Sequence, residues 1–153
     1  MGNYFVMSKR FNKREATDFG FTPIDADTAI DPKDNSIWEK TSLYDFGWGK
    51  ENGFYKVPLP EFDTLFELAL HSTSSEDMYG AAAIILEKHP DSLLDKCEKM
   101  MMDDYQKKEF KRLTELFNLK NALNRSPISG KTLKQIQNDY ARWENVSKNA
   151  CGV

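Results

Sequence analysis

Residues 60–101, PEFDTLFELALHSTSSEDMYGAAAIILEKHPDSLLDKCEKMM, contain the apolar repeat that decides the fold predicted for this chain. Pro60 suits the first turn of a helix, and the apolar residues that follow it recur at intervals of three and four as far as Leu70. Ser74, with Asp77 three positions later, resembles a capping box, and the helix that it opens is apolar around most of its circumference. Such a helix is expected at the centre of a bundle.

Helical spacing continues through the rest of the chain. The break at His89-Pro90 opens a third helix that runs to Met101, and Asp103-Asp104 leads into a fourth that ends at Ser126-Pro127. A fifth opens near Ser129 or Thr132, and the residues at helical spacing in it are Leu133, Ile136, Tyr140, Trp143 and Ser147. Five helices joined by short connections predict antiparallel neighbours packed as pairs.

The first 59 residues follow a different pattern. Prolines, glycines, Asp, Asn and Ser dominate residues 18–60, which predicts turns, while Tyr4 and Val6 favour a short extended segment. Residues 36–43 or 54–57 could form short strands or a helical turn, and the many aromatic rings would hold this stretch down. The prediction is one mainly α domain: an antiparallel five-helix bundle (60–147), an irregular aromatic-rich N-terminal extension (1–59) with one or two short strands, and a frayed tail (148–153). A strand-bearing α+β domain is the alternative.

A resemblance to known folds rests on SSEDMYGAAAIILEKHP, residues 74–90, followed by Asp-Ser-Leu-Leu. This stretch looks like a HEAT-type helical pair, with small residues where a neighbouring helix approaches closely. It also resembles the helical portions of small bacterial immunity proteins that accompany secreted toxins. The resemblance covers residues 60–101 and implies protein binding, but it includes no polar motif and transfers no functional residue.

The net charge of −3 is unevenly distributed along the chain. Residues 1–58 carry −1, residues 59–104 carry −8 and residues 105–153 carry +6. The acidic and basic segments either pack together and neutralise each other or leave an acidic face for a basic partner. No apolar run is long enough to cross a bilayer and the first residues lack the apolar region of a secretory signal, so we expect a cytoplasmic protein that does not bind membranes. The two cysteines, Cys97 and Cys151, suit free thiols in a reducing compartment.

Several short motifs resemble catalytic or ligand-binding signatures without completing them. Asp-Phe-Gly occurs at 18–20 and 45–47 without the other kinase motifs, and Ser129-Gly-Lys-Thr132 lacks the preceding glycine and strand of a phosphate-binding loop. The aspartates at 25, 27, 31 and 34 are spaced like a calcium loop, but Ile30 stands where glycine is needed and Ser36 where glutamate is needed. Turns and capping explain these segments.

Metal and nucleophile signatures are also incomplete. His71 and His89 are the only histidines, and neither the His-x3-His nor the Cys-x2-Cys spacing of zinc sites occurs. Cys97 falls on an apolar stripe, and there is no Gly-x-Ser-x-Gly elbow. We therefore expect no cofactor and no metal.

The function predicted from these observations is that of a small protein-binding module, an immunity-type inhibitor whose acidic helical face occludes a basic toxin or nuclease partner. The charged residues expected to contact that partner are Glu61, Asp63, Glu67, Glu76, Asp77, Asp91, Asp95, Asp103 and Asp104, with Trp38, Tyr44 and Trp48 as aromatic anchors. The competing interpretation is that the acids form solvated faces and the rings form core. Two other functions stay open, namely a nucleic-acid-binding protein that uses the basic last two helices and an enzyme whose site is assembled from distant residues. The sequence does not indicate the oligomeric state.

Overall fold

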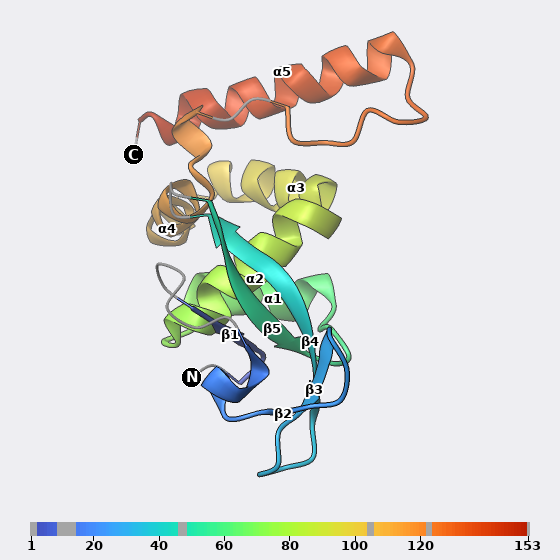
Figure 1. Ribbon diagram of the computed structural model, residues 1–153. Helices are drawn as coiled ribbons and strands as arrows, with labels where there is room; N and C mark the ends of the chain where they lie inside the picture. Colours follow the sequence, from blue (N-terminus) through green and yellow to red (C-terminus); the bar gives the residue numbers. More distant parts are fainter. Residues whose placement is uncertain (1–2, 9–14, 46–48, 104–105, 122–123, 153) are drawn as a thin grey trace. The chain divides into compact units, whose positions relative to one another are not determined.

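The computed structural model describes residues 3–8, 15–45, 49–103, 106–121 and 124–152. The chain divides into two compact units, Met1–Ile84 and Ile85–Val153, which we call the N-terminal and C-terminal units. The boundary falls within helix α2 (Ser75–Lys88). Figure 1 shows the elements, coloured from blue at the start of the chain to red at its end.

The described part of the N-terminal unit is built on an antiparallel sheet with the strand order β1-β5-β4-β3-β2. The strands are β1 (Phe5–Met7), β2 (Thr22–Pro23), β3 (Thr28–Ile30), β4 (Ile37–Asp45) and β5 (Lys50–Lys56). β4 and β5 form the central pair, with a register shift between Ser42 and Asp45. A 3-10 helix, η1 (Ala16–Phe19), precedes β2.

This sheet shows that the predicted fold class, a mainly α five-helix bundle of HEAT-like character, was wrong. The described residues combine a five-stranded antiparallel sheet with five α-helices, which is a mixed α/β fold. The expected irregular extension contains all five strands, and its residues 24–27 and 31–36 form turns between them. β1, β2 and β3 have only two or three residues, which is too short to show an alternating pattern in the sequence. The longer β4 and β5 overlap residues 36–43 and 54–57, which were offered as possible short strands.

One face of the sheet is covered by an aromatic core. Val6, Trp38 and Phe54 project from β1, β4 and β5 and pack with Phe19 and Phe21, which flank the start of β2. The rings of Phe21 and Trp38 stack with centroids 4.9 Å apart, and Phe54 meets Phe21 edge-on at 5.8 Å. These side chains fasten η1 and Phe21 onto the sheet.

Helices α1 (Phe62–His71) and α2 lie behind the sheet in the view of Figure 1. A Cβ atom added to Gly80 of α2 would lie 2.2 Å from the Phe5 ring, so the helix approaches β1 closely because this residue has no side chain. Gly53 of β5 is equally confined, since a Cβ there would lie 2.3 Å from the Val6 carbonyl oxygen. Phe5 and Val6 alternate along β1, so they face opposite sides of the sheet.

The C-terminal unit consists of α3 (Pro90–Met101), α4 (Lys107–Phe117), a 3-10 turn η3 (Leu119–Asn121) and α5 (Leu133–Ala150) in its described part. Pro90 occupies the first turn of α3, and Asn118, with φ of 52°, ends α4 in the left-handed conformation. Thr132 caps α5 through a capping box with Gln135. α5 continues through the buried Ala150, so the helix extends into the predicted frayed tail.

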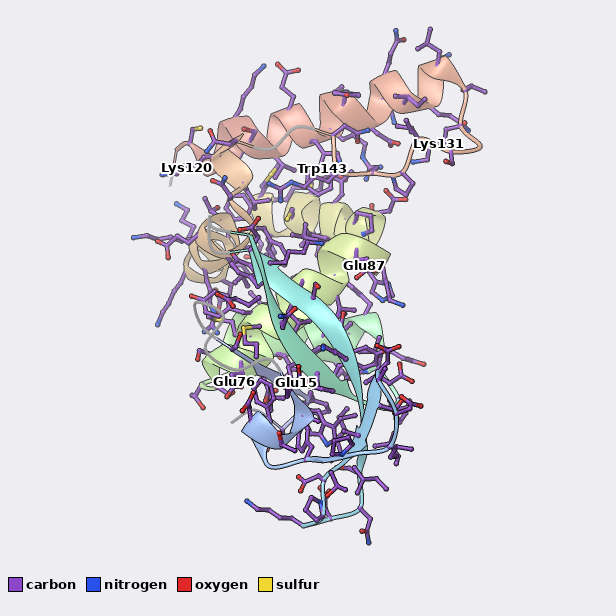
Figure 2. All side chains as sticks on the ribbon, in the orientation of Figure 1. Glu15, Glu76, Glu87, Lys120, Lys131 and Trp143 are labelled. Atoms are coloured by element: carbon purple, nitrogen blue, oxygen red, sulfur yellow. The ribbon has the colours of Figure 1, made fainter. Side chains whose placement is uncertain are left out.

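The buried face of α5 differs from the residues that the sequence spacing singled out. Asp139, Trp143, Val146 and Ala150 are buried, whereas Leu133 and Tyr140 are 71% and 52% exposed. Trp143 lies on the side of α5 that faces α3 (Figure 2), and its Nε1 donates to Ser126 Oγ at 2.9 Å. The helical spacing was therefore recognised, but Leu133 and Tyr140 lie on a different face from Trp143.

Candidate protein-binding surface

Asp77, one of the acids expected to bind a partner, instead binds the backbone of β1. Its carboxylate is 2% exposed and accepts three backbone hydrogen bonds, from Asn3 at 2.9 Å, Tyr4 at 2.9 Å and Phe5 at 3.0 Å. Its own backbone N–H donates to Ser74 Oγ at 3.3 Å, which is one half of the predicted capping box. The other half is replaced by the bonds to β1.

Glu76 has the same role beside it. Its Oε2 accepts the Met7 N–H at 2.9 Å, and Figure 2 shows Glu76 at the start of α2. Both carboxylates lie in the first helical turn, where the helix dipole favours negative charge. We call this pair, Glu76 and Asp77, the β1 clamp.

The β1 clamp covers the outer edge of the sheet. β1 is the edge strand, and it bonds to β5 through groups such as the Tyr4 carbonyl and the Ser8 N–H. The N–H groups of Phe5 and Met7 therefore point outward, where the clamp accepts them. The opposite edge is the two-residue β2, which ends at Pro23. Neither edge suits the addition of a partner strand, so we expect a protein partner to be bound through side chains.

Two further nominated acids, Asp95 and Asp91, have cationic partners inside the C-terminal unit. Asp95 of α3 accepts from Arg142 Nη2 of α5 at 2.8 Å, and Glu98 accepts from the same nitrogen at 2.5 Å. The hydrogen bond with Glu98, followed by that with Asp95, raises the pKa of Arg142 above its usual range. Asp91 lies 4.0 Å from Lys131 Nζ, which also donates to Asp139 at 2.6 Å. In this unit the acidic and basic segments do pack together.

The two proposed aromatic anchors that the structure describes, Trp38 and Tyr44, are not exposed rings. Trp38 is 2% exposed, lies in the aromatic core and donates its Nε1 to Ser36 Oγ at 2.8 Å. Tyr44 is half-buried, and its ring lies 4.7 Å from the ring of Tyr79. Trp48 and Asp104 lie outside the described residues, and Asp103 is half-buried after the end of α3.

The remaining nominated acids, Glu61, Asp63 and Glu67, lie together on α1. All three are exposed, and the intervals between them place Asp63 and Glu67 on one side of the helix. Glu67 lies 3.8 Å from His71, while Glu61 and Asp63 form no ion pair among the described residues. Among the nominated acids that the structure describes, these three are exposed and have no lysine or arginine partner.

Apolar side chains adjoin these acids in the segment between β5 and α1. Val57 is 36% exposed, Pro58 is exposed, and Phe62 is half-buried with its ring stacked 5.5 Å from Phe66. The Val57 N–H donates to the Ile37 carbonyl at 2.9 Å, which fixes this segment to the end of the sheet. Sequence reasoning missed Val57 and Pro58, although a valine before two closely spaced prolines indicates an extended segment. We call Val57, Pro58, Glu61, Asp63 and Glu67 the α1 face.

The rest of the described chain has little that suits a nucleophile or a metal. Burial raises the pKa of the Cys97 thiol to about 12, which keeps it protonated and unreactive at neutral pH. Among the residues described, no group of three or more His, Cys, Asp or Glu side chains could hold a metal ion. His71 adjoins Glu67 at the exposed end of α1.

The polar side chains of the incomplete ligand motifs form hydrogen bonds within the protein. Asp25 accepts the N–H groups of Asp27 and Thr28, and the bond from Asp27 is the main cause that lowers its pKa. In the next turn Asp34 accepts hydrogen bonds from the hydroxyl and the N–H of Ser36, and these bonds lower the pKa of Asp34. In the Ser-Gly-Lys-Thr segment, Lys131 pairs with Asp139 and Thr132 caps α5. These side chains stabilise turns and a helix start.

The basic residues of the last two helices do not form one uninterrupted ridge. Lys131 and Arg142 are paired with carboxylates, and the exposed cations of α4 are Lys107, Lys108 and Lys111. Pairing reduces the charge that a phosphate backbone would meet along α5, so the arrangement gives little support to nucleic-acid binding.

Comparisons of the chain with protein-family models, with curated proteins and with solved structures find no match. None of the helices in the described residues combines the length and the apolar character needed to cross a bilayer.

Proposed function

We propose that this chain is a small cytoplasmic protein-binding module of the inhibitor kind, and that its α1 face binds a basic protein such as a toxin or nuclease. The observation that carries the proposal is the exposure of Glu61, Asp63 and Glu67 beside Val57 and Pro58. Exposed acids attract a basic surface from a distance, and Glu61 and Asp63 form no ion pair among the described residues. Adjacent apolar side chains add burial once contact is made.

The charge of the whole N-terminal unit supports the same partner. It contains 8 Lys and Arg against 14 Asp and Glu, a net charge of −6, whereas the C-terminal unit carries +3. A field of this sign accelerates association with a cationic protein and weakens association with a polyanion. Binding through side chains is also consistent with the sheet, because neither of its edges suits the addition of a partner strand.

The test is a pull-down from the native host with the tagged full-length chain at about 50 mM and about 300 mM salt, a range over which surface charges become strongly screened. The variant Glu61→Lys/Glu67→Lys alters the α1 face. Its matched control, Asp27→Lys/Glu115→Lys, makes the same change in net charge at two exposed positions elsewhere. Circular dichroism before the assay confirms that each protein is folded.

We expect a basic protein that is retained at low salt, is released at higher salt and binds the α1-face variant at least tenfold more weakly than the control variant. Equal losses in both variants would show that only the net charge matters and would reject the α1 face. Retention of nucleic acid, or of no specific protein, would reject the inhibitor function.

A further inference from the structure

The first strand of the sheet occupies a site whose two walls are shaped around it. β1 lies between β5 and the start of α2, and its Phe5 and Val6 are fully buried at 0% exposure. A Cβ atom on Gly80 of α2 would lie 2.2 Å from the Phe5 ring, and one on Gly53 of β5 would lie 2.3 Å from the Val6 carbonyl oxygen. Both walls approach the strand this closely because they carry glycine at these points. We call the space enclosed by β5, the β1 clamp and Gly80 the strand site.

The backbone of residues 3–8 is hydrogen-bonded along both sides of the strand site. On the β5 side the Lys56 N–H donates to the Tyr4 carbonyl and the Ser8 N–H donates to the Asn52 carbonyl, each at 2.9 Å. On the α2 side the β1 clamp accepts four N–H groups of the same segment. Backbone hydrogen bonds select an extended segment, and pockets for its side chains select the sequence. The strand site therefore recognises an extended segment with two buried apolar residues at its centre.

The rest of the described sheet does not depend on β1. This strand lies at the edge, pairs with β5 over three positions, and supplies only Val6 to the described members of the aromatic core. β5, β4, β3 and β2 stay paired with one another without it. A short strand near the end of a chain opens in local fluctuations that leave the central pair, β4 and β5, intact.

We propose that the strand site accepts residues 3–8 of a second copy, so that two copies of this chain exchange β1. The fit of this segment is on display in the structure, because the chain's own β1 fills the site. Exchange between identical copies keeps every contact of the strand, which makes it a low-cost route to a dimer. Exchange replaces a strand and adds none, so it is compatible with the closed edges of the sheet, and it does not involve the α1 face.

The amount of exchange depends on the concentration of the second copy. The chain's own strand competes for the site with an effective concentration on the order of 1 mM, as expected for a segment held by a short connection. Exchange is therefore a minor reaction at micromolar concentration, and the exchanged dimer accumulates toward 1 mM. The β1 clamp makes the same bonds in both forms, so a weaker clamp should change the rate of exchange and not its equilibrium.

A mixed disulfide tests the exchange directly. Tyr4 lies opposite Lys56 in the register of β1 and β5, and the Cα atoms of such a pair are about 5.5 Å apart, which a disulfide can span. In a Cys151→Ser background, full-length copies carrying Tyr4→Cys are mixed with copies carrying Lys56→Cys under mild oxidation. Cys97 is buried and stays out of the reaction. The matched control replaces the second copy with one carrying Asp27→Cys, an exposed position in the same unit.

We expect the heterodimer of the Tyr4→Cys and Lys56→Cys copies to exceed the control heterodimer by about tenfold or more, because the strand site holds the two thiols together. Adding Glu76→Ala to both copies removes the bond to the Met7 N–H and should make the heterodimer form about fivefold faster. A merely structural role of the clamp would not change this rate. Equal amounts of the two heterodimers would overturn the proposal.

A strand locked in its own site gives an independent measurement. In the same background, the double variant Tyr4→Cys/Lys56→Cys is oxidised at high dilution, where the disulfide closes within one chain and holds β1 on its own β5. Sedimentation equilibrium up to about 1 mM should show the mass of the Cys151→Ser parent rising toward that of a dimer, while the locked variant stays a monomer until its disulfide is reduced. A parent that stays monomeric over this range, or a locked variant that dimerises as the parent does, would overturn the proposal.

Discussion

The two units use their carboxylates in different ways. In the N-terminal unit, Asp77 is almost fully buried and its partners are backbone N–H groups of a strand more than 70 positions away in the sequence. In the C-terminal unit, Asp95 and Glu98 remain partly exposed, and their partner is the Arg142 guanidinium on a neighbouring helix. The first arrangement holds a strand in place, and the second joins two helix surfaces.

This difference shows why an acidic segment cannot be interpreted from its charge alone. A buried carboxylate with three donors is a structural element, because its loss leaves those donors without acceptors. A carboxylate in a surface ion pair contributes little, since water and salt compete with its partner. Among the nominated acids that the structure describes, those at the start and along α1 have no lysine or arginine partner. Mutations in these three groups should separate the three situations.

The largest effect is expected at the β1 clamp. Asp77→Ala removes the acceptor for the N–H groups of Asn3, Tyr4 and Phe5, each in a partly or fully buried position. We expect a loss of about 3 kcal/mol or more in unfolding free energy, because unsatisfied buried donors cost roughly 1–3 kcal/mol each and water will reach some of them. Urea unfolding measures the total, and hydrogen exchange of these three amides should accelerate most.

The matched control is Asp63→Ala, which removes an exposed acid from the first turn of α1. Its cost should stay below about 1 kcal/mol, the usual value of a charge near a helix end. Equal losses in the two variants would contradict the clamp.

A smaller effect is expected for Glu76, the second member of the clamp. Glu76→Ala leaves the Met7 N–H without this acceptor at a half-buried site, and we expect a loss of about 1 kcal/mol. Exchange of the Met7 amide should accelerate while the amides of residues 3–5 stay protected by Asp77. If all four amides exchanged together, the two carboxylates would act as one unit and their separate roles would be rejected.

The surface ion pair of the C-terminal unit should contribute less. Glu98→Ala removes an acceptor for Arg142, where both side chains are about one third exposed, at 31% and 33%. We expect a loss of about 0.5 kcal/mol at low ionic strength, and less than this at about 1 M salt because the charges are screened. Urea unfolding at both salt concentrations measures the difference, while the cost of Asp77→Ala should depend little on salt.

The sequence was sufficient to predict the helices but not the sheet. An apolar period of 3.6 residues is a local property, so the helices from α1 to α5 could be located from spacing. β1 and β3 have three residues each and β2 has two, and their stability comes from pairing and from the aromatic core. These contacts join residues far apart in the sequence, such as Val6 and Phe54.

The candidate site was predicted only in part for the same reason. Composition indicated an acidic region, and the exposed acids of α1 belong to it. Nothing local distinguishes Asp77 from Asp63, since both lie in the first turn of a helix. The difference comes from the distant backbone of residues 3–5, which donates to Asp77, whereas Asp63 is exposed. Two aromatic residues were also placed wrongly. Trp38 was expected at a binding surface but is buried, and Tyr140 was expected on the same helical stripe as Trp143 but is half exposed.

The smallest effect concerns an exposed carboxylate that binds backbone N–H groups without burial. Asp25 accepts from Asp27 and Thr28, and these bonds lower its pKa below the ordinary value of 3.8. Because the pKa is lower in the folded state, Asp25 stabilises the fold fully above about pH 4, and this contribution is lost as the pH falls through the folded-state pKa. Asp25→Asn should therefore destabilise the protein slightly at pH 6 and by a smaller amount at pH 2.5. Urea midpoints of the parent and the variant at the two pH values measure the difference, in which the titration of the other carboxylates cancels. An equal difference at both pH values would show that ionisation of Asp25 adds no stability, and would contradict a lowered pKa in the folded state.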